Sequence, residues 1–449
     1  MMIHIAQGRQ GDIYALKSRD INENDNIHYH KNKDEEGQLE HSLASDEIDV
    51  YGGLKEWQII KTVYAPLNGV VIGKQPHNIV KEVNLLKRIN HPNITTLLRY
   101  TFNNDTFEHQ LIFPLYAITL NELFQDSSFP FEYEHEQITH IQNNPLDIPK
   151  YISYQLLQGI NYLHNLNSPI SHLDLNPSNI LLDWNGLLKI IDFGISFSLT
   201  TKDQEEFSNC IKEEDNEFTL FCDVGTGSYR APELLFSPIR YDPLKIDLWA
   251  IGCIIAQLFR PFESIEINSN FGSESSSSSS SSSSTKSSLI EISNNSIKEQ
   301  FDIFDNLDNL KFIRKPLFNS KYGSLGLSSS IFKILGTPTK ENWPDFENLP
   351  DSSKINFPFS KSKKLLNYLP ELNKFNNENK NDILEIIEGL LKLDPNLRKN
   401  TKEILNFKWF NNLPLIQSNE IMRKYLIIAK SNFIRKINED TTNPQGRVW

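Results

Sequence analysis

The most informative part of this 449-residue sequence is His172-Leu-Asp-Leu-Asn-Pro-Ser-Asn179, which is followed by Asp192-Phe-Gly194. Transfer of a phosphoryl group needs a clamp that neutralises charge, one or two metal sites, and a carboxylate that orients the attacking hydroxyl. These two segments supply carboxylates and amides of that kind. A solvated loop that carries two aspartates by chance is the plain alternative, but it does not explain why further motifs follow at consistent spacings. The stretch therefore predicts a phosphoryl-transfer site.

Three later motifs extend this pattern. They are Ala231-Pro-Glu233, Asp247-Leu-Trp249 and Leu393-Asp-Pro-Asn-Leu-Arg398. With the first stretch they resemble the motifs of protein kinases, and the resemblance covers essentially all of the chain that we expect to be ordered. It implies an α+β, two-lobed protein kinase fold, with a small antiparallel-sheet N-lobe that contains helix C and a larger, mainly helical C-lobe. In such kinases the equivalents of Glu233 and Arg398 form a buried ion pair, so we assign both a structural role.

The resemblance also implies roles for the polar residues of the central stretch. Asp174 is expected to be the catalytic base, Asn179 to bind one Mg²⁺, and Asp192 to bind the bridging Mg²⁺. Thr226, in Gly-Thr-Gly, is expected to hydrogen-bond Asp174 and position the loop. ATP and Mg²⁺ are the cofactors that follow from this resemblance.

The N-terminal motif is less regular than the central one. Ile5-Ala-Gln-Gly-Arg-Gln-Gly-Asp-Ile-Tyr14 resembles a kinase glycine-rich loop in which Ala6 replaces the first glycine. Gly8 and Gly11 would still let backbone N–H groups approach the phosphates. Alone, the motif fits a plain hairpin equally well. Its position one strand before the other parts favours a nucleotide site formed by Ala6, Gly8, Gly11 and Ile13.

Two lysines compete for the role of phosphate clamp. Lys17 lies only six residues after Gly11, on the second strand before the chain has turned, so we interpret it as an exposed strand residue. Lys61 lies on the next strand, after an acidic insert. It precedes Glu82 by about the separation that kinases use between the equivalent lysine and the helix-C glutamate. We therefore predict that Lys61 clamps the phosphates and pairs with Glu82.

The segment Phe113-Pro-Leu-Tyr116 takes the place of gatekeeper and hinge in this resemblance. A proline at the second position keeps its carbonyl, which can accept a hydrogen bond from the adenine amino group, and lacks only an N–H. Pro114 is thus compatible with nucleotide binding, and the backbone of Tyr116 is expected to complete the contact.

Composition divides the chain into three regions. The expected N-lobe covers residues 1–115 and contains a polar, acidic insert at 18–54, which is too hydrophilic to bury much surface. The expected C-lobe covers 116–415 and contains a second insert at 262–328, with a serine run at 275–284 that is typical of linkers. Residues 416–449 form a C-terminal tail with a helical stretch after Pro414. Within these regions, strands are predicted at 3–17, 57–63 and 111–113, and helices at 76–89, 151–166 and 382–410.

Bulk properties narrow the functional classes. The net charge of -12 argues against a nucleic-acid partner, because phosphate backbones need a basic face. The three cysteines show no metal-ligand spacing, which suits a reducing compartment. There is no N-terminal signal pattern and no apolar run near the roughly 20 residues needed to cross a bilayer. These features predict a soluble protein of the cytoplasm, the nucleus or both, without a membrane partner.

Two segments point to one branch of the kinases. Pro76-His-Asn-Ile-Val-Lys-Glu-Val-Asn-Leu-Leu86 looks like the cyclin-contacting helix of cyclin-dependent kinases, and Leu335-Gly-Thr-Pro-Thr-Lys-Glu-Asn-Trp-Pro344 looks like the insert of the same group. Those kinases hold an activation-loop phosphothreonine with three arginines, whereas this chain has Lys81, Leu173 and Phe197 there. Leucine and phenylalanine cannot bind phosphate, and lysine lacks the bidentate fork of arginine. We therefore expect that activation-loop phosphorylation is not needed.

A kinase of this group that is not itself switched on by phosphorylation is similar to the single-subunit cyclin-dependent-kinase-activating kinase of fungi. That enzyme also has a degraded glycine loop and a Phe-Pro hinge. The resemblance implies a monomer that acts on a protein substrate, the activation-loop threonine of a cyclin-dependent kinase. Whether a cyclin-like partner binds the segment at 76–86 stays open at this point.

Two alternatives also stay open. The first is another proline-directed kinase of the same group, because Arg230 follows Tyr229 where such kinases neutralise a carbonyl. The second is a pseudokinase that acts as a binding module, because Asn176 stands where serine/threonine kinases carry a lysine that contacts the transferring phosphate. Loss of one such donor can cost on the order of 10²–10³ in rate. The enzyme is favoured by the retention of Lys61, Glu82, Asp174, Asn179 and Asp192.

Overall fold

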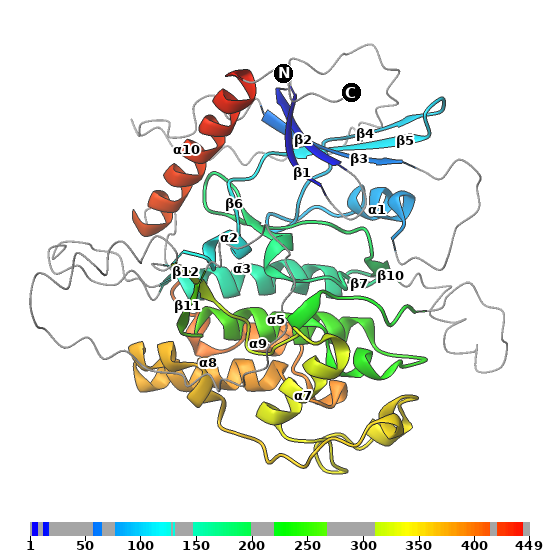
Figure 1. The fold of residues 1–449 in the computed structure, drawn as a ribbon, viewed down its shortest axis with the longest axis vertical. Coiled ribbons are helices and arrows are strands. Elements are labelled where there is room, and N and C mark those ends of the chain that lie inside the picture. The colour runs from blue at the N-terminus through cyan, green and yellow to red at the C-terminus, as the bar shows by residue number, and fades with distance from the viewer. Residues whose placement is uncertain are drawn as a thin grey trace, which may run out of the picture.

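The molecule has two lobes, a smaller one rich in strands and a larger one built mainly from helices (Figure 1). The computed structural model describes residues 2–7, 12–17, 57–64, 77–126, 129–130, 147–198, 220–266, 310–413 and 420–442. The small lobe contains an antiparallel sheet and one helix, while the large lobe holds most of the main hydrophobic core. The predicted two-lobed α+β fold is confirmed.

The small lobe is built on a five-stranded sheet in the order β1-β2-β3-β5-β4. Its strands are β1 (Met2–Gln7), β2 (Asp12–Lys17), β3 (Trp57–Tyr64), β4 (Arg99–Asn103) and β5 (Glu108–Pro114). All neighbours are antiparallel. β1 lies at one edge and carries a bulge at Ile5, because the register moves from His4↔Tyr14 to Ala6↔Ile13.

Helix α1 (Ile79–Leu86) lies below the sheet in Figure 1 and is shorter than the helix predicted at 76–89. Its first turn is fixed by Asn78, whose side chain accepts a hydrogen bond from the Lys81 backbone N–H at 3.0 Å. An N-cap of this kind satisfies a donor that has no partner inside the helix. One face of α1 is buried, and it includes Glu82 as well as apolar residues.

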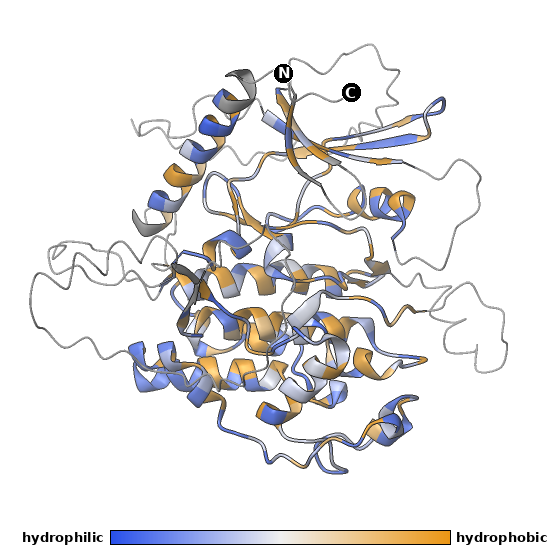
Figure 2. Ribbon diagram, in the orientation of Figure 1, coloured by the Kyte–Doolittle hydropathy of each residue, from blue (hydrophilic) through white to orange (hydrophobic). Residues whose placement is uncertain are grey.

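The large lobe is organised around α5 (Pro243–Leu258), which is buried along almost its whole length and mainly apolar (Figure 2). Around it lie α2 (Leu120–Leu123), α3 (Asp147–His164), α7 (Gly323–Leu335), α8 (Asn377–Leu390) and α9 (Thr401–Leu405). The helices predicted at 151–166 and 382–410 correspond to α3 and to α8 with α9. Gly252 allows α5 and α8 to approach, since a Cβ there would lie 2.9 Å from the Leu390 Cβ.

Short paired strands frame the polar motifs. β6 (Ile118–Thr119), β8 (Ile180–Leu182) and β9 (Leu188–Ile190) form one antiparallel sheet, and β7 (Ile170–Ser171) pairs with β10 (Phe197–Ser198). The segment at 172–179 therefore runs from β7 to β8, and the Asp192-Phe-Gly194 motif runs from β9 to β10. Because these strands pair, the two motifs lie side by side.

The predicted insert at 262–328 is too wide, because both of its ends belong to the folded lobe. β11 (Phe262–Glu266) pairs antiparallel with β12 (Leu310–Arg314). Arg314 is fully buried and donates a hydrogen bond to the Phe129 carbonyl at 3.0 Å. Contacts of this kind join segments far apart in the chain, and local composition does not reveal them.

The helical stretch predicted after Pro414 is α10 (Glu420–Thr442), which runs beside both lobes (Figure 1). The acidic insert at 18–54 and the serine run at 275–284 lie outside the described residues. In the part of the chain that the structure describes, no helix is both long and apolar enough to cross a membrane.

Candidate active site

The loop that carries Asp174 is held by the core helix α5. The carboxylate of Asp247, fully buried on α5, accepts hydrogen bonds from the backbone N–H groups of His172 and Leu173, both at 2.8 Å. His164 of α3 also hydrogen-bonds this carboxylate, at 2.9 Å, which is a structural contact. Leu173 has a φ of 66°, a left-handed conformation that is unfavourable for leucine. The Asp247 carboxylate stabilises this conformation and so shapes the loop.

Asp174 is oriented by two neighbouring side chains. Thr226 Oγ1 donates a hydrogen bond to Oδ1 at 2.6 Å. Asn179 Nδ2 donates to Oδ2 at 3.2 Å and to the Asp174 backbone carbonyl at 2.9 Å. Burial raises the pKa of Asp174, and the hydrogen bond from Thr226 opposes this shift. An oriented carboxylate with a raised pKa can accept a proton from a hydroxyl group.

A second polar cluster joins the two lobes. Lys61 Nζ on β3 donates hydrogen bonds to both carboxylate oxygens of Glu82 on α1, at 3.0 and 3.1 Å. The same ammonium group donates to Asp192 Oδ1 at 2.8 Å. The structure therefore brings Lys61, Glu82 and Asp192 together, while Lys17 is exposed on β2. Because Asp192 belongs to the large lobe, this cluster fixes both β3 and α1 against it.

The charges of Lys61 and Asp192 stabilise each other, whereas burial raises the pKa of Glu82 despite its contact with Lys61. Burial by itself would lower the pKa of Lys61, but the carboxylates of Glu82 and Asp192 outweigh it and raise the pKa. Burial likewise disfavours the charged form of Asp192, yet Lys61 holds the pKa of Asp192 below its usual range. At neutral pH the site thus presents an ammonium group and an ionised carboxylate.

The Asp192-Phe-Gly194 motif is folded with its phenylalanine in the core. Phe193 is buried and meets His172 edge-on, with ring centroids 4.9 Å apart. His172 Nε2 donates a hydrogen bond to the Ile191 carbonyl at 2.8 Å. Asp192 has a φ of 65°, and its carboxylate lies beside Lys61. The packing of Phe193 and His172 thereby fixes the position of Asp192.

Asn179 and Asp192 offer oxygen atoms that suit Mg²⁺. The amide nitrogen of Asn179 is engaged with Asp174, which leaves the amide oxygen as a metal ligand. Mg²⁺ usually binds one or two protein oxygens and completes its shell with water and substrate phosphates, so this donor set fits. Among the described residues, no group of three or more His, Cys, Asp or Glu side chains is arranged to hold a metal ion.

The predicted nucleotide-binding residues of the small lobe are only partly described. Ile13 of β2 pairs with Lys61 of β3, and Ala6 of β1 pairs with Ile13. Ile13 therefore lies on the strand next to the lysine, and Ala6 lies one strand further away. Gly8 and Gly11 lie outside the described residues, so their contact with phosphate stays a prediction.

The connection between the lobes contains a hydrogen bond that the sequence did not predict. Trp184 Nε1 donates to the Leu115 carbonyl at 2.8 Å. Pro114 ends β5, and the hydroxyl groups of Tyr116 and Thr95 are hydrogen-bonded at 3.0 Å. The contact between adenine and the backbone at Pro114 and Tyr116 stays a prediction. Trp184 lies in a turn after β8, and nothing in that local sequence indicates that its indole reaches the hinge.

Asn176 and Arg398 form hydrogen bonds that support the fold around the site. Asn176 accepts a hydrogen bond from the Ser178 backbone N–H at 2.9 Å and donates to the Asp174 carbonyl at 3.0 Å. Its amide thus caps the loop. Arg398 donates to both carboxylate oxygens of Glu233 at 2.7 Å, which is the predicted ion pair.

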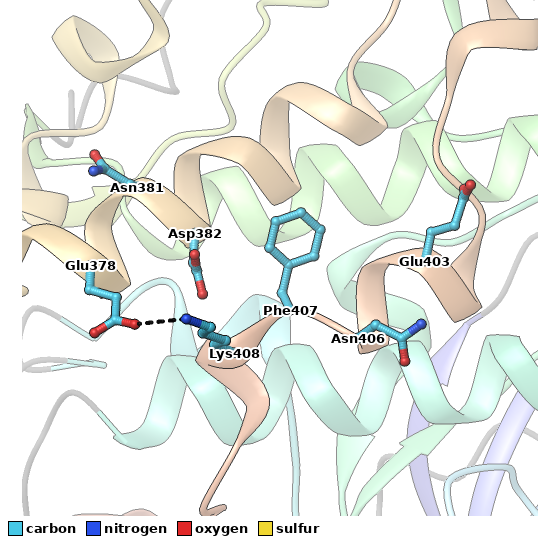
Figure 3. Close-up of a pocket in the computed structure, with 7 residues that line it drawn as sticks. All are labelled: Glu378, Asn381, Asp382, Glu403, Asn406, Phe407 and Lys408. Atoms are coloured by element: carbon cyan, nitrogen blue, oxygen red, sulfur yellow. Dashed lines mark ion pairs between the residues drawn. The ribbon is translucent and has the colours of Figure 1, made fainter.

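A hollow beside α8 and α9 is separate from these groups (Figure 3). Its lining residues are Glu378, Asn381, Asp382, Glu403, Asn406, Phe407 and Lys408. Lys408 lies 3.7 Å from Glu378, and none of the residues singled out for phosphoryl transfer lines this hollow. It is therefore not the candidate active site.

Comparison with known proteins identifies the family. Residues 50–410 match the protein kinase domain. Serine/threonine-protein kinase SSN3 of Candida albicans is 27% identical over 351 residues, which are 76% of this chain but 45% of that protein. Cyclin-dependent kinase 7 of Xenopus laevis is 27% identical over 340 residues, which are 75% of this chain and 68% of that protein.

A solved structure agrees with this assignment at the level of the fold. The crystal structure of the yeast RNA Pol II CTD kinase CTDK-1 complex matches with a TM-score of 0.52 and 22% identity, over 80% of this chain and 86% of that chain. The matched domain covers most of the sequence, and the relatives include cyclin-dependent kinases. Protein kinases of this family use ATP and Mg²⁺. This chain therefore belongs to the protein kinase family, and the relatives that it resembles are named as serine/threonine and cyclin-dependent kinases.

Proposed function

We propose that this kinase phosphorylates the activation-loop threonine of cyclin-dependent kinases and does not require phosphorylation of its own activation segment. The observation that carries the proposal is the environment of Leu173, Phe197 and Lys81. Leu173 is 4% exposed, and the Lys81 ammonium lies 4.8 Å from the centroid of the Phe197 ring. A phosphate placed here would meet apolar side chains instead of bidentate guanidinium groups.

Side chains of the protein itself hold the segment that precedes Thr226. The Tyr241 hydroxyl donates a hydrogen bond to the Phe221 carbonyl at 2.6 Å, and Arg230 Nη2 donates to the Cys222 carbonyl at 3.1 Å. In kinases that depend on phosphorylation, new contacts to the phosphate order the activation segment. Contacts between unmodified residues at this segment support activity without such a step.

The geometry also supports direct transfer of a phosphoryl group to a hydroxyl. In this proposal Asp174 accepts the proton of the target threonine, and Lys61, held by Glu82, neutralises phosphate charge. Asn179 and Asp192 bind the metal. When bound, ATP with Mg²⁺ supplies the phosphoryl group, and the protein contributes mainly orientation and electrostatic stabilisation.

The substrate part of the proposal is supported by the resemblance to the single-subunit activating kinase of fungi. The same resemblance supports a monomeric enzyme. In addition, the contact between Lys61 and Glu82 is complete within one chain, so α1 already lies in the position that pairs these residues. This supports a kinase in which no partner subunit is needed to align the lysine.

Incubation of the full-length protein with a monomeric cyclin-dependent kinase, Mg²⁺ and labelled ATP tests the proposal. Label should enter the activation-loop threonine of the target and should be lost when that threonine is replaced by alanine. The Asp174→Asn variant should give no label. Pretreatment of the enzyme with a phosphatase should change the rate by less than about twofold, since in this proposal activity does not depend on a phosphate in the segment.

Two results would count against the proposal. Absence of label at the target threonine, while a general substrate is phosphorylated, would contradict the substrate assignment. A large loss of activity after phosphatase treatment would contradict independence from phosphorylation. Label transferred by the Asp174→Asn protein would reveal a contaminating kinase.

Another proline-directed kinase is the second candidate, and Arg230 is the observation that favours it. Its guanidinium group bonds the Cys222 carbonyl and lies 3.5 Å from the Asp223 carboxylate. Proline-directed kinases neutralise a carbonyl with the arginine at this position. A peptide library randomised after the target residue separates the two candidates, because a kinase that activates cyclin-dependent kinases should not require proline there.

A further inference from the structure

Helix α10 presents one apolar face to both lobes. Met422, Tyr425 and Leu426 are buried in the main core. Phe433 and Ile437 instead pack against a small hydrophobic cluster of the N-lobe, which is formed by Ile3, Ala15 and Trp57. With a rise of about 1.5 Å per residue, Met422 and Ile437 lie about 22 Å apart along the helix axis. A helix docked at both ends in this way links the two lobes on the side seen at the left of Figure 1.

The first half of α10 is docked in the large lobe. Tyr425 is 2% exposed, and its ring meets Phe129 edge-on with centroids 5.6 Å apart. Phe129 in turn meets Phe124 edge-on, at 6.0 Å. Aromatic contacts of this geometry add to the stabilisation from burial. The large lobe therefore provides a fixed base for the helix.

The second half of α10 contacts the small lobe at two points. Phe433 meets Trp57 of β3 edge-on, with centroids 5.3 Å apart. Lys436 Nζ donates a hydrogen bond to the Ile5 carbonyl at 3.2 Å. Ile5 is the bulged residue of β1, which the β1–β2 register leaves without an opposite residue. Lys436 thus supplies a partner to the backbone at the irregular point of the strand.

The same small core includes the hinge. Leu115 and Trp184, which are joined by their own hydrogen bond, pack with Phe433 against the core that contains Trp57. α10 therefore contacts β1 and β3, and the hinge packs against the same hydrophobic cluster as α10 does. The relative positions of these elements set the distance between the lobes. Ile5 also directly precedes Ala6, the first residue of the motif that is predicted to cover the nucleotide.

We propose that Phe433 and Lys436 are positioning residues for the nucleotide, and that α10 holds β1 and the hinge at the separation from the large lobe that ATP with Mg²⁺ requires. Neither side chain touches the reacting atoms. Their loss should weaken nucleotide binding and leave the step after binding unchanged. This proposal rests on membership of the kinase family and not on the identity of the protein substrate.

The Lys436→Met variant of the full-length protein tests the proposal, because methionine keeps the aliphatic stem and removes the donor. The KM for ATP should rise about 3- to 10-fold, with kcat and the KM for a general protein substrate within about twofold, as loss of one charge-assisted hydrogen bond predicts. The Kd of a non-hydrolysable ATP analogue with Mg²⁺, measured by calorimetry, should rise by the same factor. Lys436→Arg should restore both values.

Two further variants make the test specific. Phe433→Leu keeps apolar volume but removes the edge-on ring contact, so it should also raise the KM for ATP. Arg423→Met is the matched control, since it removes one positive charge from an exposed position in the first half of the same helix. It should leave the KM for ATP unchanged.

Unchanged values of KM and Kd for the nucleotide in both Lys436→Met and Phe433→Leu would overturn the proposal. A parallel fall in kcat, in affinity for both substrates and in thermal midpoint would also overturn it, because such a pattern indicates general stabilisation. Binding of the ATP analogue does not depend on the protein substrate. Failure of this proposal is therefore distinguishable from failure of the proposed function.

Discussion

At the scale of single residues, the chemistry depends on the protonation of Asp174. Burial raises the pKa of this carboxyl group, whereas the hydrogen bond from Thr226 favours the charged form. A base works only when it is deprotonated, so the raised pKa should place the acid limb of kcat/KM above the ordinary value for aspartate, about 4. Thr226 thus has two effects, since it orients the carboxylate and keeps the base charged to lower pH.

Replacement of Thr226 by valine separates these effects from simple packing, because valine has nearly the same shape. Loss of the donor removes an interaction with the carboxylate form, so the pKa of Asp174 should rise further. We expect the acid limb of kcat/KM to move to higher pH, and kcat at neutral pH to fall by about 10- to 100-fold. Initial rates measured across the pH range provide the check.

Thr226→Ser is the matched control for this prediction, since serine keeps the hydroxyl donor. It should retain the position of the acid limb. If Thr226→Val lowers kcat but leaves the pH profile where it was, the hydroxyl acts on orientation alone. If serine and valine shift the profile equally, the hydrogen bond is not the cause.

At the scale of elements, α5 is the point to which the functional segments are attached. Asp247 binds the loop before Asp174. At the same end of α5, Arg398 donates to the Lys245 carbonyl at 2.8 Å while it also pairs with Glu233. One arginine therefore joins the segment at 232–236, the start of α5, and the chain after α8. Its side chain is fully buried.

Replacement of Arg398 by methionine should strongly destabilise the fold. The change would leave Glu233 buried without its partner, and breaking a buried pair in this way typically costs about 3–5 kcal/mol. The expected result is a corresponding loss in the free energy of unfolding, measured by denaturant titration.

Lys399→Met provides the comparison for Arg398, because Lys399 pairs with Glu385 at 2.7 Å on a far more exposed part of the surface. Solvent screening reduces the contribution of such a pair to about 0–1 kcal/mol. Equal losses in the two variants would mean that burial of the Arg398–Glu233 pair has no special effect.

At the scale of the whole molecule, local motifs predicted the site better than they predicted its supports. The choice of Lys61 over Lys17 followed from strand order and from the separation to Glu82, and the structure places Lys61 beside that glutamate. The same holds for Thr226 with Asp174. The residues of such motifs form one site, so their order and spacing along the chain indicate which side chains will lie close together.

The contacts that the sequence did not predict join segments that are distant in the chain. Trp184 bonds the hinge, Lys436 bonds β1, and Arg314 orders one end of the predicted insert. None of these residues belongs to a periodic or turn pattern that would identify its partner. The boundary of α1 also differed, because the side chain of Asn78 starts the helix later than the apolar spacing alone indicates.

The pairing of β11 with β12 allows the connection between these two strands, residues 267–309, to be shortened. Glu266 and Leu310 are opposite each other at the end of the ladder, so an Asn-Gly turn can join the two strands directly. Closing a connection about twentyfold shorter should cost about 3 kcal/mol less in chain entropy. We therefore expect the shortened protein to keep its kcat and KM and to unfold at higher denaturant. If it folds with equal stability but loses activity on a protein substrate and not on a peptide, residues 267–309 take part in recognition of that substrate.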